Sequence, residues 1–189
     1  MVLAGVALLV AVVIGWLSGG SLDRLGGLPL RSRRLVWGAF AAQVVGTFIG
    51  GPLYAVGLAL SAGLVAWFLA RNSGVRGTGL VAAGLLANAL VVGLNGAMPV
   101  SVEAAGRAGT TTQHILIGDD QRHEIADRHS RLRFLGDVVP VRAPWRPEVV
   151  SPGDILVAAG LAQLVLVGMR TGRGGAKHVR PKEPSPAVV

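Results

Sequence analysis

The sequence has no cysteine, and it is poor in charged and aromatic residues. Without cysteine the chain has no disulfide, no thiolate zinc site and no cysteine nucleophile. Charged residues make up 15% of the chain, whereas a soluble domain carries roughly 25%. Aromatic residues make up only 5%, so the apolar half of the chain is mainly Ala, Val and Leu. This composition indicates an integral membrane protein, and the scattered glycines suit close contacts between membrane helices.

Long apolar runs alternate with short polar connections along the chain. A membrane-spanning helix needs about 20 mostly apolar residues. The sequence Gly50-Gly51-Pro52 interrupts one uncharged stretch, because glycine permits a tight turn and proline cannot continue a helix past its first turn. The sequence therefore predicts an all-α fold, an integral membrane bundle of five transmembrane helices. Their predicted bounds are residues 2–19, 35–49, 53–70, 77–98 and 152–169.

The last predicted helix has a clear start signal. Ser151 is placed as the N-cap, Pro152 at the first helical position and Asp154 at the third. The Ser hydroxyl can accept from a free backbone N–H, and the carboxylate can reach back to the cap. A cap at the membrane surface is the favoured interpretation of Asp154. An intramembrane ion or proton site is the alternative.

Lys and Arg gather in the short connections that orient membrane proteins. Basic residues follow the first, third and fifth predicted helices, whereas the Gly-Gly-Pro turn has none. This alternation predicts a protein of the cell membrane with its N-terminus outside and its C-terminus in the cytoplasm. The bilayer itself accounts for the net charge of +8, so no nucleic-acid partner is expected.

The two longest segments outside the predicted helices are residues 99–150 and 171–189. The connection over residues 99–150 becomes extracytoplasmic, and its basic and acidic residues are equal in number. Its length alone suggests a specific role, because few connections in a compact domain are so long. The tail over residues 171–189 is rich in Gly, Pro and basic residues, and we expect it to be disordered in the cytoplasm.

Histidine and carboxylate side chains in the long connection are candidate metal ligands. The candidates are His114, His123, Asp127 and His129. The run from His123 to Asp127 resembles the metallopeptidase pattern His-Glu-x-x-His, but Asp127 stands where the pattern needs its second histidine. The favoured alternative is a solvated helix of mixed charge over residues 120–132, on which His123 and Asp127 share one face.

A short apolar stretch follows these histidines. Leu132, Phe134 and Leu135 are too few to span a bilayer, but they can lie at the lipid interface, and Trp145 suits the same depth. A lid folded over the helix ends is the alternative interpretation.

Three short motifs resemble those of a family of small bacterial multi-pass membrane proteins known only as a domain of unknown function. The motifs are Asn95-Gly96-Ala97-Met98-Pro99-Val100, Leu135-Gly136-Asp137 and Ser151-Pro152-Gly153-Asp154. The resemblance covers about residues 1–170 and implies a multi-pass membrane protein without an established activity. The matching positions that it marks as important are Asn95, Met98, Pro99, Gly136, Asp137, Pro140 and Asp154.

Polar residues near the outer mouth of the bundle form the candidate site. Asn95 lies near the end of the fourth helix, Asp137 precedes the return of the chain into the membrane, and Asp154 begins the fifth helix. We expect this cluster to tie the connection to the helix ends, and cation binding is the alternative. Asn88, deeper in the fourth helix, is expected to form an interhelical hydrogen bond, because buried amides need partners.

The sequence favours a protein without catalytic activity and without a cofactor, because it holds no intact catalytic motif. The leading hypothesis is an accessory or partner-binding membrane subunit, whose partner is another membrane protein or a second copy. A small oligomeric transporter or channel is one alternative, although the predicted helices hold almost no ionisable groups. A metal-dependent enzyme at the outer membrane face is the other.

Overall fold

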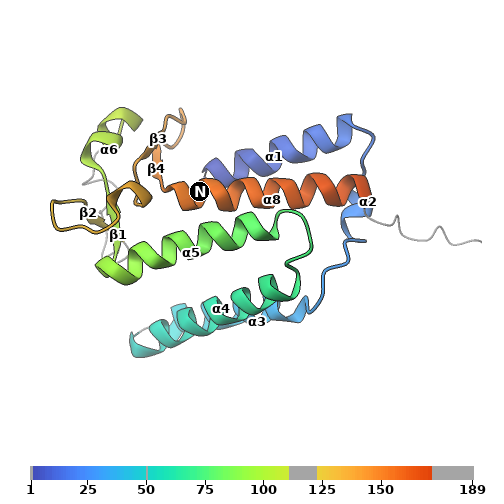
Figure 1. Ribbon diagram of the computed structural model, residues 1–189, viewed down its shortest axis with the longest axis horizontal. Coiled ribbons are helices and arrows are strands. Elements are labelled where there is room, and N and C mark those ends of the chain that lie inside the picture. Colours follow the sequence, from blue (N-terminus) through green and yellow to red (C-terminus); the bar gives the residue numbers. More distant parts are fainter. Residues whose placement is uncertain (1, 50, 111–122, 172–189) are drawn as a thin grey trace, which may run out of the picture.

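The computed structural model describes residues 2–49, 51–110 and 123–171, and most of them are helical (Figure 1). The helices are α1 (Val2–Leu17), α2 (Leu22–Leu25), α3 (Arg34–Ile49), α4 (Gly51–Arg71), α5 (Thr78–Asn95), α6 (Val102–Ala108) and α8 (Pro152–Thr171), with a 3-10 helix η1 (Arg133–Leu135). The strands are β1 (Met98–Val100), β2 (His123–Ile125), β3 (Val139–Val141) and β4 (Glu148–Val150). The five long helices occupy the five places that the apolar runs indicate.

The end of α5 differs from its predicted position at residue 98. Gly96 follows Asn95 with φ 87°, a left-handed conformation that glycine adopts without strain. Its N–H donates to the carbonyl of Val92 at 2.7 Å, which closes the helix. Met98 therefore begins strand β1 and not a further helical turn.

Helix α8 lies at the centre of a three-helix group, with α1 and α5 packed against it (Figure 1). The α5–α8 contact depends on glycines facing one another. A Cβ on Gly84 would lie 2.4 Å from the carbonyl oxygen of Gly153, and a Cβ on Gly160 would lie 2.6 Å from that of Gly77. These distances leave no room for a side chain, so the two antiparallel backbones come close together.

Helices α3 and α4 pack chiefly on each other and lie beside the three-helix group (Figure 1). The side chain of Asn72, just after α4, attaches this pair to the preceding loop. Its amide accepts from the N–H of Arg31 at 2.7 Å and donates to the carbonyls of Arg31 and Phe68. The hydroxyl of Thr78 donates to the carbonyl of Asn72, which links the same point to the start of α5.

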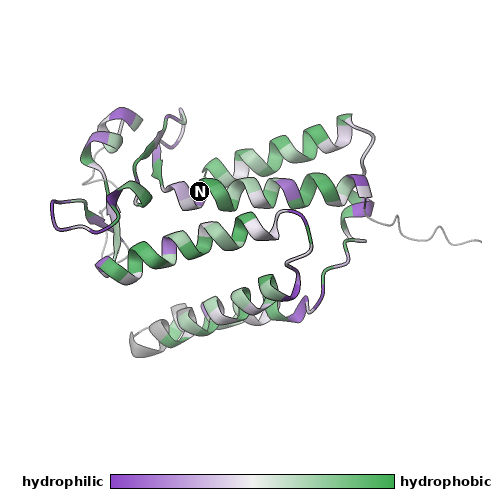
Figure 2. Cartoon of the chain, in the orientation of Figure 1, coloured by the Kyte–Doolittle hydropathy of each residue, from purple (hydrophilic) through white to green (hydrophobic). Residues whose placement is uncertain are grey.

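Two helices, α5 and α8, are long and apolar enough to cross a membrane. Only 22% of the apolar window in α5 and 28% of that in α8 is buried within the protein. Figure 2 shows hydrophobic residues along the helices and hydrophilic ones mainly near their ends. Large exposed side chains include Leu9, Trp37, Phe40, Phe48 and Leu86.

The described residues of the connecting segment, 96–110 and 123–151, gather at one end of the bundle, opposite α2 (Figure 1). β1 pairs with β2 in parallel, and β3 pairs with β4 in antiparallel orientation. The helix expected over residues 120–132 is wrong for residues 123–132, because His123 pairs with Met98 in the β1–β2 ladder. His123 and Asp127 therefore share no helical face. The tail predicted to be disordered lies, beyond Thr171, outside the described residues.

Candidate functional site

A closed hydrogen-bond network joins α5 to the start of α8. The amide of Asn88 donates to Oδ1 of Asp154 at 2.8 Å, and its oxygen accepts from the hydroxyl of Ser151 at 2.8 Å. The Ser151 hydroxyl accepts from the N–H of Asp154 at 2.9 Å, and the Asp154 carboxylate accepts from the N–H of Ser151 at 3.1 Å. The N-cap predicted for this helix is confirmed, as is the interhelical bond of Asn88.

Asp137 lies beside this network and is held by its own backbone. Its N–H donates to the carbonyl of Pro99 at 2.9 Å, and its carbonyl accepts from the N–H of Ser101 at 2.9 Å. The residue is only 5% exposed. Burial, reinforced by the negative charges of Asp154 and Glu148, raises the pKa of Asp137 to about 7. The carboxyl group is therefore poised between its neutral and charged forms near neutral pH.

The imidazole of His123 faces Asp137 from strand β2, with 3.6 Å between Nε2 and Oδ2. This separation exceeds a good hydrogen bond. With this imidazole beside it, burial still holds the pKa of Asp137 above its usual range.

Asn95, at the end of α5, binds the backbone of the connecting segment. Its amide donates to the carbonyl of Arg131 at 3.0 Å and to that of Val91 at 2.8 Å, and its oxygen accepts from the N–H of Arg131 at 2.6 Å. The structure thus brings Asp137 and Asp154 within electrostatic reach of each other, whereas Asn95 binds the loop backbone. The same pairing of an Asn side chain with an Arg backbone occurs at Asn72 and Arg31.

The proposed metal ligands fall into separate places. His123 faces Asp137, whereas His129 and Asp127 contact each other in an exposed turn, with 3.3 Å between Nδ1 and Oδ2. His114 lies outside the described residues. Among the described residues, no three His or carboxylate side chains come together in a group suited to a metal ion.

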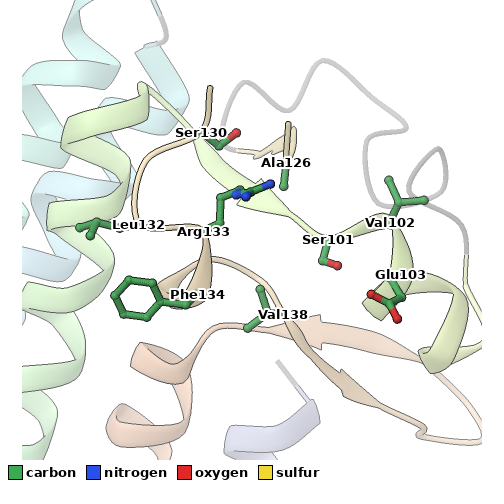
Figure 3. A pocket seen from close by; sticks show the side chains of 9 residues that line it. All are labelled: Ser101, Val102, Glu103, Ala126, Ser130, Leu132, Arg133, Phe134 and Val138. Atoms are coloured by element: carbon green, nitrogen blue, oxygen red, sulfur yellow. The ribbon is translucent and has the colours of Figure 1, made fainter. Parts of the chain in front are cut away.

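An open hollow of about 670 Å³ lies beside these elements (Figure 3). Figure 3 shows Arg133 and Phe134 of η1 on one side and Glu103 of α6 on another. Phe134 is 67% exposed. The full lining is Ser101, Val102, Glu103, Ala126, Ser130, Leu132, Arg133, Phe134 and Val138.

A family model matches residues 28–166, which include the α5–α8 network and all described strands. The chain belongs to the family of unknown function DUF5317. The match begins after α1 and α2, so it is shorter than the resemblance over about residues 1–170. No curated protein and no solved structure matches this chain.

Several residues of the sequence motifs shape the backbone around Asp137 in this DUF5317 chain. Gly136 lies where a Cβ would be 2.5 Å from the carbonyl oxygen of Pro99, so only glycine allows the strand contact there. Met98 and Pro99 are buried in strand β1. These positions build the frame around Asp137.

The sequence of this DUF5317 chain does not predict the contact between Glu148 and the start of α1. The Glu148 carboxylate accepts from the N–H groups of Val2 and Leu3 at 3.0 and 2.8 Å. Burial acts to raise the pKa of Glu148, but the hydrogen bonds at the start of α1 outweigh it and lower the pKa. Nothing in the local sequence around Glu148 indicates a partner so distant in the chain.

Proposed function

We propose that this protein is a multi-pass protein of the cell membrane that acts without catalysis, as an accessory subunit that binds another membrane protein. In this proposal α1, α3, α4, α5 and α8 cross the bilayer. The N-terminus lies outside and the C-terminus lies in the cytoplasm. The observation that carries the proposal is the exposure of long apolar helices, because α5 and α8 bury only 22% and 28% of their apolar windows. In the membrane, lipid chains would cover the apolar side chains that these helices leave exposed.

The polar groups in the helices support a scaffold more than a transport pathway. Asn88, Ser151 and Asp154 bond one another, and the hydroxyl of Ser61 donates to Oε1 of Gln43 at 3.3 Å. Within the described part of the chain, no buried side-chain N or O atom lacks a hydrogen-bond partner. Intramembrane polar groups that carry ions usually face one another across a wet cavity. Here they join the helices.

The connecting segment is the proposed partner-binding surface. Asn95 holds it at Arg131, and Glu148 holds it at the start of α1. A segment fixed in this way loses little conformational freedom when a partner binds. It presents Ile125, Phe134 and Trp145, whose exposed fractions are 49%, 67% and 74%. Exposed aromatic side chains on a rigid frame are typical anchors of protein interfaces.

Cysteine labelling tests the membrane topology, because the chain has no cysteine of its own. Gly106 and Gly74 are both exposed, and a Cβ at either would meet nothing within 4 Å. We expect Gly106→Cys to react with a membrane-impermeant maleimide in intact cells. Gly74→Cys should react only after permeabilisation. Reversal of this pattern would overturn the proposed orientation.

Site-specific photo-crosslinking tests the accessory role. A photoreactive residue at Phe134 or Trp145 should give a defined product with one other membrane protein, in native membranes. The matched control is Leu9 of α1, which is 64% exposed on an apolar helix and should give lipid adducts only. If the connecting segment crosslinks only to lipid or only to a second copy, the accessory role is wrong.

A further inference from the structure

Four arginines lie together at the end of the bundle opposite the connecting segment. Arg31, Arg33 and Arg34 precede or begin α3, and Arg71 ends α4. In the described part of the chain, none of the four forms an ion pair with a carboxylate. This uncompensated charge lies beside the apolar faces of α3 and α4.

The fold arranges three of these arginines, Arg33, Arg34 and Arg71, around one hollow of about 680 Å³. Its lining is Ser32, Arg33, Arg34, Leu35, Trp67 and Arg71. A volume of this size lies within the range of small-molecule sites, roughly 300–1,000 Å³. Trp67 is 55% exposed and Leu35 is half-buried, so the hollow has apolar walls as well as a basic rim.

Several contacts hold the hollow in shape. Asn72 fixes the backbone of Arg31 through two hydrogen bonds, which places the start of α3 against the end of α4. Ser32 adopts φ 59°, which is unusual for a residue with a side chain. In this conformation its hydroxyl accepts from Arg71 at 3.2 Å. The Arg71 guanidinium also lies 5.6 Å from the centroid of the Trp67 ring, within cation–π range.

The arginines are not equivalent. Arg33 donates to the carbonyls of Gly26 and Leu28 at 3.2 and 2.9 Å, so it stabilises the loop. Arg71 is oriented by Ser32 and Trp67 but keeps further donors, since guanidinium has five. Arg34 is exposed at the start of α3, and none of the hydrogen bonds between described residues uses its side chain. Between described residues, Arg33 uses two of its donors on the loop, Arg71 uses one and Arg34 uses none, so Arg34 and Arg71 have the most donors left for a ligand.

We propose that this hollow, bounded by Ser32, Arg34, Trp67 and Arg71, binds the headgroup of an anionic phospholipid. Guanidinium groups match phosphate oxygens in geometry and charge. An exposed tryptophan beside them suits the boundary between headgroup and acyl chains. Basic pockets between membrane helices on the cytoplasmic side bind such headgroups. The inference rests on the proposed membrane insertion and adds a specific lipid to it.

The test measures lipid binding to the full chain in neutral detergent by native mass spectrometry. Phosphatidylglycerol is compared with phosphatidylcholine, and inorganic phosphate is tested alone as a soluble anion. We expect selective retention of phosphatidylglycerol and no effect of inorganic phosphate. Arg34→Gln and Arg71→Gln should each weaken phosphatidylglycerol binding about fivefold, since one arginine near the lipid surface contributes about 1 kcal/mol.

The matched control is Arg76→Gln, which removes the same charge from an exposed residue of the α4–α5 loop outside the hollow. This variant should bind phosphatidylglycerol like the parent chain. Arg34→Lys keeps the charge but loses the guanidinium geometry, so it should weaken binding less than Arg34→Gln. The inference is overturned if Arg76→Gln is equally weakened, if phosphatidylcholine binds as tightly, or if inorganic phosphate competes for the hollow.

Alkaline carbonate extraction of membranes is measured in parallel and separates two failures. A chain that stays in the membrane but shows no lipid selectivity contradicts only the lipid site. A chain that carbonate releases contradicts the proposed function itself.

Discussion

The Asn88 amide on α5 donates a 2.8 Å hydrogen bond to the Asp154 carboxylate on α8. These residues meet where α8 begins, and each also bonds Ser151. The Ser151 side chain therefore caps α8 and joins it to α5 at the same time. The network therefore fixes the end of the connecting segment, at Ser151, against both α5 and α8.

Replacing Asn88 tests this network. Asn88→Leu has a similar shape but removes the amide, so Ser151 and Asp154 each lose a partner. We expect the free energy of unfolding to fall by about 1–2 kcal/mol, since unsatisfied buried polar groups are costly. The measurement is chemical unfolding of detergent-purified protein. Leu86→Ala, at a side chain 70% exposed on the same helix, is the control and should change little.

Close packing of α5 on α8 predicts a second effect. In Gly84→Ala the new Cβ would meet Gly153 O at 2.4 Å and Val157 N at 2.9 Å, and backbone atoms cannot move aside cheaply. We expect a loss of about 1–3 kcal/mol in the free energy of unfolding. Gly93→Ala is the matched control on the same helix, since its Cβ would meet nothing within 4 Å. Equal losses in both variants would contradict the close α5–α8 contact.

The buried carboxyl of Asp137 predicts a dependence on pH. Its pKa is raised from 3.8 to about 7 by burial, Asp154 and Glu148. A carboxyl with a raised pKa favours the folded state when protonated. Stability from this group is therefore complete below pH 4 and is lost as the pH rises through 7, by a difference on the order of 2–4 kcal/mol.

Asp137→Asn tests this dependence, because it keeps the shape and removes the titration. We expect unfolding midpoints of the parent chain to fall between about pH 4 and pH 7, and those of Asp137→Asn to stay nearly level. His123→Gln is the control for the neighbouring imidazole. A parallel decline in the parent chain and Asp137→Asn would assign the effect to another group.

The bond between Asn95 and Arg131 predicts local order in the connecting segment. Asn95→Asp keeps an acceptor but loses the donor to the carbonyls of Arg131 and Val91. We expect faster amide hydrogen exchange around residues 130–137, while α8 stays protected. Unchanged exchange around Arg131 would mean that other contacts hold this turn.

Local signals in the sequence identified much of the fold. Uncharged runs located the long helices, and Ser151, Pro152 and Asp154 marked the start of α8 correctly, because capping depends on neighbouring residues. The outer cluster was less predictable. Asp137 and Asp154 lie within electrostatic reach of each other, whereas Asn95 binds the backbone of Arg131. Which backbone group it binds cannot be read from the sequence, because every residue offers the same N–H and C=O.

The sequence by itself determined that the chain is apolar and that it is mostly helical. Both follow from residue type and spacing. Only the tertiary structure decided which distant groups meet: Glu148 with the start of α1, His123 with Asp137, and Ser32 with Arg71. It also decided that His123 lies in a strand, because pairing with Met98 outweighs the local helical pattern. Such contacts depend on how the chain folds back, and no local pattern records that.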